Sequence, residues 1–211
     1  MTYAEILAEV ILLTKRGDMA DKIAAAIRTV TLRAHRLDYF WRDRIESQLQ
    51  WAADQTIVDI NVVTWLPRFR AINYARYWDP ATSALGLLLD KIDPRDVLDE
   101  YNYEKLNRYY MAGDVLKIKF ETPSRGIQVG YYCSPVVHPA ASYSSWIADQ
   151  FPDIIIQGAV AMIFNTMGKQ EEARSVNAMV GFDIVPQPNS AQKGPTLVEQ
   201  LRAYALEEDA R

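Results

Sequence analysis

The sequence of 211 residues has few of the side chains on which disulfide and metal chemistry depend. Its single cysteine, Cys133, has no partner for an internal disulfide, which excludes the disulfide framework of small secreted proteins. Its only histidines, His35 and His138, lie far apart in the chain, which makes a zinc site improbable. We therefore expect no metal and no cofactor.

The motifs that mark common enzymes are missing as well. The chain has neither the phosphate-binding patterns GxxxxGK(S/T) and GxGxxG nor the nucleophile elbow GxSxG. Carboxylates cluster between Asp90 and Glu100, but without the glycine and final glutamate of a calcium loop, and Asp93 followed by Pro94 suits a helix cap. We expect that the protein is not an enzyme. Abundant Asp and Glu leave open a carboxylate pair, as in a cell-wall hydrolase.

The chain has no excess of positive charge of the kind that binds the phosphates of DNA. The net charge is −4, from 23 Lys and Arg against 27 Asp and Glu. Arginines gather locally between Arg28 and Arg44, so a nucleic-acid-binding module remains an alternative. A solvated face, or a face that pairs with acidic residues of a partner, is the favoured interpretation of this stretch.

No apolar run is long enough to cross a bilayer. The longest, from Ile154 to Met167, is broken by Gln157 and Asn165. The first residues carry no basic region of the kind that opens a signal peptide. We therefore expect a soluble protein that is made in a cytoplasm.

The first forty residues have a helical pattern. Thr2 and Glu5 form a capping box, and Gly17 suits the residue just after a helix. Asp18 is expected to cap a second helix. The apolar residues of the two helices recur every three or four positions, at Tyr3, Ile6, Leu7, Val10 and Ile11 and then at Ile23, Ile27, Val30, Ala34 and Leu37.

The middle of the chain changes to the two-residue period of half-buried strands. We expect strands around residues 45–51, 58–62, 69–78, 109–111, 116–120 and 127–131, with a hairpin turn at 112–114. A short helix is expected to open at Asp93 and to run through Asp99.

Helical character returns near Ser144. Pro152 is expected to start a fresh helix, and the segment from Ile154 to Met167 is apolar nearly all round, as in a helix buried on most sides. Prolines follow Ile184, and a last short helix carries only a thin apolar stripe.

These patterns predict an α+β fold. We expect a helical bundle formed by the N- and C-terminal helices, an inserted β-rich domain and an extended C-terminal tail. The predicted boundaries are 1–40 and 141–183 for the bundle, 41–140 for the β-rich domain, and 184–211 for a C-terminal arm with a short helix.

Five segments of the chain form a recognisable series: 25–40 (AAIRTVTLRAHRLDYF), 66–72 (LPRFRAI), 109–116 (YYMAGDVL), 145–152 (SWIADQFP) and 168–173 (GKQEEA). In this order they resemble the adaptor proteins that join the head of a tailed bacteriophage to its tail, and the resemblance covers roughly residues 1–183.

This resemblance implies a virion protein of the neck or tail, present in the host cytoplasm during assembly. Such adaptors form a homo-oligomeric ring, typically of twelve copies, between the portal and the tail tube or nozzle. Double-stranded DNA passes through the lumen without sequence-specific binding, and no membrane is involved. A tail-completion or stopper protein of the same neck is the alternative.

An assembly protein needs binding residues in place of catalytic ones. We expect Arg33, His35 and Arg36 on the second helix to contact partners. Leu197, Leu201 and Tyr204 form the thin stripe of the tail, which we expect to order when it docks on the portal or on a neighbouring subunit.

Overall fold

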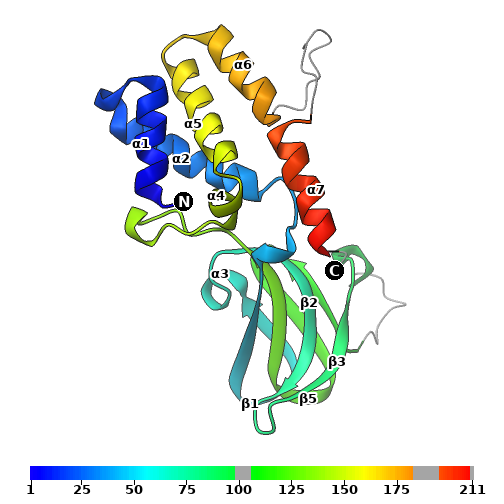
Figure 1. The fold of residues 1–211 in the computed structure, drawn as a ribbon. Coiled ribbons are helices and arrows are strands. Elements are labelled where there is room, and N and C mark those ends of the chain that lie inside the picture. Colours follow the sequence, from blue (N-terminus) through cyan, green and yellow to red (C-terminus); the bar gives the residue numbers. More distant parts are fainter. Residues whose placement is uncertain (98–105, 183–194, 210–211) are drawn as a thin grey trace. The chain divides into compact units, whose positions relative to one another are not determined.

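The computed structural model describes residues 1–97, 106–182 and 195–209 (Figure 1). The chain forms two compact units. The first, here called the helical unit, consists of Met1–Trp41 and Pro135–Arg211. The second, the barrel unit, is the continuous segment Arg42–Ser134.

The helical unit contains α-helices from both ends of the chain. They are α1 (Tyr3–Thr14), α2 (Ala20–His35), α4 (Trp146–Gln150), α5 (Pro152–Thr166), α6 (Gln170–Val180) and α7 (Leu197–Asp209). Short 3-10 helices cover Gly17–Met19 and Ala140–Ser142.

Helix α5 is the centre of the helical unit, as its all-round apolar sequence predicts. It packs against α1, α2, α4, α6 and α7, and in Figure 1 it lies between α1 (blue) and α6 (orange). Its buried residues are Ile154, Ile155, Ile156, Gly158, Ala159, Val160, Ala161 and Ile163. At Gly158 an added Cβ would lie 2.7 Å from Val30 Cγ1, so the missing side chain lets α2 approach α5 closely.

The observed ends of these helices agree only in part with those predicted from the sequence. The Thr2–Glu5 capping box is confirmed, because each side chain bonds the other residue's backbone N–H. The expected cap at Asp18 is wrong: α2 begins two residues later, and Met19 caps it without a side-chain bond. Lys15, not Gly17, takes the left-handed conformation that ends α1.

The barrel unit holds the strands. They are β1 (Arg44–Asn61), β2 (Phe69–Asp79), β3 (Ala84–Lys91), β4 (Arg108–Ala112) and β5 (Val115–Cys133), with a four-residue helix α3 (Val62–Trp65) after β1. A 3-10 helix covers Pro94–Val97, and the rest of the helix expected through Asp99 lies outside the described residues.

The sheet closes on itself because β5 is long enough to pair with three strands. Its first residues pair with β4, its last residues pair with β2, and β1 runs beside both parts. Together with the β2–β3 and β3–β4 pairs, these pairings close a four-stranded barrel, and β1 is an additional strand.

The fold class expected from the sequence is therefore wrong. The chain is α+β, with seven α-helices in the described residues and a sheet that closes into a barrel with an extra strand, in place of a bundle with an inserted domain and an extended tail. The alternation of residues 116–120 and 127–131 predicted two separate strands. They form one strand, and closure follows from that continuity.

Two glycines of β5 allow large β2 side chains to lie across the outer face of the barrel. A Cβ on Gly126 would lie 2.7 Å from the Trp78 ring, and one on Gly130 would meet the Tyr74 ring. The inner face holds the apolar core, which includes Leu116, Ile118, Phe120, Ile127, Val129 and Tyr131.

Candidate interaction surfaces

The three predicted binding residues on α2 have different environments. His35 is 1% exposed, and its Nε2 lies 2.9 Å from Ser145 Oγ. Arg33 is exposed, yet its guanidinium lies over the Phe182 ring and donates to the Phe182 carbonyl at 3.0 Å. Arg36 is exposed at the end of α2. The structure thus places His35 in the core and leaves Arg36 at the surface.

The three predicted residues of the tail contact this chain's own helical unit. Leu201 is fully buried, and Leu197 packs partly buried on the same core. The Tyr204 ring meets the Phe151 ring edge-on with centroids 5.2 Å apart, and its hydroxyl donates to Glu208 at 2.6 Å. The predicted capping box of Thr196 and Glu199 is present at the start of this helix.

The arginines between Arg28 and Arg44 are divided between the two units and do not belong to a single element. Arg28, Arg33 and Arg36 belong to α2 or its end in the helical unit, whereas Arg42 and Arg44 belong to the barrel unit. Arg28 bonds the carbonyl of Ala24 in its own helix.

Within the described residues, no three His, Cys, Asp or Glu side chains are placed to hold a metal ion. Cys133 is buried, as predicted, and burial raises the pKa of its thiol, which disfavours the reactive thiolate. His138 is exposed in the loop before Pro139.

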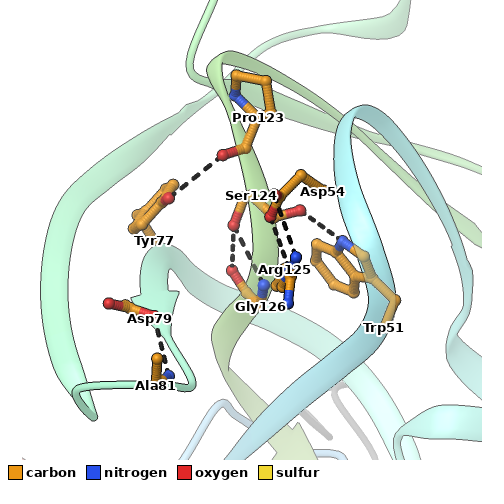
Figure 2. A network of polar contacts seen from close by, with 9 residues as sticks. All are labelled: Trp51, Asp54, Tyr77, Asp79, Ala81, Pro123, Ser124, Arg125 and Gly126. Carbon is orange, nitrogen blue, oxygen red and sulfur yellow. Dashed lines mark hydrogen bonds and ion pairs between the residues drawn. The ribbon is translucent and has the colours of Figure 1, made fainter.

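The polar network in Figure 2 lies where the pairing of β1 with β5 is irregular. Trp51 Nε1 donates to the Ser124 carbonyl at 2.6 Å, and Ser124 Oγ donates to the Gly126 carbonyl at 2.8 Å. Arg125 pairs with Asp54 at 2.9 Å on the exposed side. These side chains bond backbone carbonyls of β5 where the register shifts, so the network supports the strand pairing there.

The helical unit exposes large apolar side chains on two different helices. Leu12 and Leu13 of α1 are 68% and 42% exposed, and Met179 of α6 is 40% exposed. In Figure 1, α5 lies between these two helices. Met162 of α5 is also exposed.

The barrel unit exposes a second set of apolar side chains. Leu85, Leu87 and Leu88 of β3 are all more than half exposed. Ile57, Val63 and Trp65 are exposed around the end of β1 and α3. Sequence analysis missed β3, although the run Leu85–Leu89 is the signal that could have revealed it.

A cavity of about 650 Å³, here called the barrel-mouth groove, opens beside the first residues of β2. It is lined by Val63, Leu66, Arg68, Phe69, Arg70, Ala71, Ile72, Lys91, Met111, Gly113 and Asp114. All of these residues belong to the barrel unit. In the sequence, the segment 66–72 predicted part of a strand and carried a family resemblance, and no local pattern indicated a groove there.

A comparison of the sequence with models of known protein families found no match, and a comparison with curated proteins also found none. Among the described residues, no helix combines the length and the apolar character needed to cross a bilayer.

Proposed function

We propose that this protein is a structural subunit that assembles head to tail into a ring, in the role of the adaptor between the portal and the tail of a bacteriophage. The observation that carries the proposal is that two separate helices of the helical unit expose large apolar side chains, Leu12 and Leu13 on α1 and Met179 on α6. A ring needs two unlike faces on each subunit that fit each other after a rotation.

Other features of the chain are consistent with an assembly role. Exposed apolar side chains also occur on β3 and around α3, which provides surface for a partner other than a second copy. The net charge of −4 suits a conduit through which DNA passes without being held. The specific partners, a portal protein and a tail tube or nozzle protein, rest on the resemblance of residues 1–183 to the adaptor family.

The proposal is tested by mixing the purified protein with rings of a portal protein from the same phage. We expect a complex that co-migrates in size-exclusion chromatography and shows a second ring by electron microscopy. A protein that stays monomeric and does not bind portal rings would contradict the proposal. A ring located elsewhere in the neck by cryo-electron microscopy would support the alternative of a stopper or tail-completion protein.

Two single variants test the head-to-tail geometry. Leu12→Asp and Met179→Asp each disable one face, so neither variant should form a ring alone, and an equimolar mixture should stop at small complexes because each variant retains only one usable face. Leu206→Asp is the matched control, because it also replaces an exposed apolar side chain by a carboxylate, at a residue of α7 that is 71% exposed. This variant should assemble normally. Full rings from either α1 or α6 variant would exclude these faces.

A further inference from the structure

The barrel-mouth groove lies beside the first part of β2, which pairs on only one side among the described residues. Residues Phe69–Tyr77 of β2 pair with β5 on one side. On the other side, within the described part of the chain, β3 pairs with β2 only from Ala75 onwards. The first six residues of β2, Phe69–Tyr74, therefore have a strand edge that no strand of the described residues pairs with.

The lining shows that the groove follows this edge. It includes five consecutive residues, Arg68–Ile72, of which Phe69–Ile72 are the first four residues of β2. The groove is thus parallel to the backbone, in the position that a further strand would occupy.

The groove combines apolar and basic surface. Leu66 is fully buried, and Phe69, Ile72 and Met111 are half-buried. Three cations, Arg68, Arg70 and Lys91, line it together with a single carboxylate, Asp114.

The cations differ in how far they are already neutralised. Arg70 pairs with Asp43 at 3.0 Å, whereas the side-chain bond of Arg68 within the described residues goes to a neutral group, the Ser134 carbonyl, at 2.8 Å. For Lys91, which is exposed, no ion pair is found among the described residues. The local excess of positive charge therefore comes mainly from Arg68 and Lys91.

We propose that the barrel-mouth groove binds an extended acidic segment of a partner protein by strand addition to β2. The backbone of the segment pairs with Phe69–Asn73, its apolar side chains cover Leu66, Ile72 and Met111, and its carboxylates meet Arg68 and Lys91. Main-chain hydrogen bonds provide affinity in this kind of recognition, and alternate side chains provide specificity. The proposal does not depend on the ring.

The probe is a blocked peptide of alternating valine and glutamate, titrated into the full-length protein and followed by amide NMR. We expect saturable shifts at Phe69–Asn73 and at Met111. A peptide with lysine in place of glutamate should not bind. A glutamate peptide that is N-methylated at every residue should lose binding as well, because neither of its edges can donate to β2. Neither comparison requires a change in the protein.

Lys91→Glu tests the basic rim and should weaken binding roughly tenfold or more. Lys119→Glu, at an exposed β5 residue outside the groove, is the matched control and should bind like the wild type. The amide spectrum of each free variant shows whether the barrel is folded. The proposal is overturned if the glutamate peptide gives no saturable shift at millimolar concentration, or if the lysine or N-methylated peptide binds equally well.

Discussion

His35 and Ser145 are joined by a buried hydrogen bond of 2.9 Å that connects the end of α2 to the start of α4. Ser145 Oγ also accepts from the backbone N–H of Ala148 at 3.2 Å, so one hydroxyl caps α4 and holds α2 to it. Trp146 packs edge-on against the His35 ring with centroids 5.8 Å apart.

Ser145→Ala should destabilise the helical unit by about 1–3 kcal/mol, because the change removes a helix cap and leaves a buried imidazole nitrogen without this partner. Urea unfolding followed by far-UV circular dichroism measures the loss. The neighbouring Ser144→Ala is the control, since Ser144 is exposed and bonds Val136 through its backbone only. Equal stability of the two variants would show that the buried bond contributes nothing.

Gly158→Ala should also destabilise the helical unit, although alanine favours a helix over glycine by about 1 kcal/mol. The added Cβ would lie 2.7 Å from Val30 and 2.9 Å from Phe182, and such overpacking costs about 1–3 kcal/mol. Thermal unfolding shows whether the change in stability is a loss or a gain. In the control Gly17→Ala the nearest atom is 3.9 Å from the Cβ, so its stability should stay within about 0.5 kcal/mol of the wild type. A more stable Gly158→Ala variant would show that α2 and α5 can separate easily.

Asp43→Asn and Asp54→Asn compare a buried ion pair with an exposed one in the barrel unit. Asp43 and Arg70 are 4% and 12% exposed, whereas Asp54 and Arg125 are both more than half exposed. We expect a loss of about 3 kcal/mol for Asp43→Asn and less than about 1 kcal/mol for Asp54→Asn. Denaturant unfolding of both variants measures the difference, and similar losses would contradict this explanation.

The capping boxes predict a dependence of stability on pH. A hydrogen bond from the Thr2 backbone lowers the pKa of Glu5, and one from the Thr196 backbone lowers the pKa of Glu199. A carboxyl whose pKa is lower in the folded than in the unfolded state stabilises the fold above the unfolded pKa, about 4.3 for glutamate. This contribution is lost as the pH falls through the folded pKa.

The double variant Glu5→Gln with Glu199→Gln should therefore lose less stability than the wild type on acidification below about pH 4.3, because glutamine accepts the bond and does not titrate. Thermal midpoints over a pH series measure the effect. Glu171→Gln, at an exposed carboxyl outside both capping boxes, is the control and should follow the wild type. Parallel pH curves for the wild type and the double variant would contradict the prediction.

Leu201→Ala should destabilise the helical unit by about 2–5 kcal/mol, because this side chain is fully buried in the core. Leu206→Ala on the same helix removes the same atoms from a residue that is 71% exposed, and should change stability by no more than about 0.5 kcal/mol. Chemical unfolding of both variants measures the two changes in the free energy of unfolding. Equal effects would show that α7 does not hold its place on the core, in accordance with the docking arm expected from the sequence.

Patterns of local origin were predicted well. The capping boxes at Thr2 and Thr196, the start of a helix at Pro152 and the buried character of α5 depend on residues within a few positions of each other. The hairpin turn between β4 and β5 is equally local. Such features can be recognised because the interacting residues are also neighbours in the sequence.

Features that depend on distant pairing were not predicted. Strand β5 continues through Pro123, and its pairing with both β2 and β4 closes the barrel. The sequence also shows Leu201 as part of a thin stripe without showing the core that covers it. The barrel-mouth groove arises from the difference in length between β2 and β3, which no local pattern reveals.

The continuity of the barrel unit has a consequence for synthesis on the ribosome. All of its strands are translated before Pro135, so the barrel can close while the rest of the chain is still being made. Helices α1 and α2 are translated first, yet Ile6, Val10, Ile23 and Ile27 acquire their cover only when α5 emerges. The earliest part of the chain is therefore the part that needs protection from aggregation for longest.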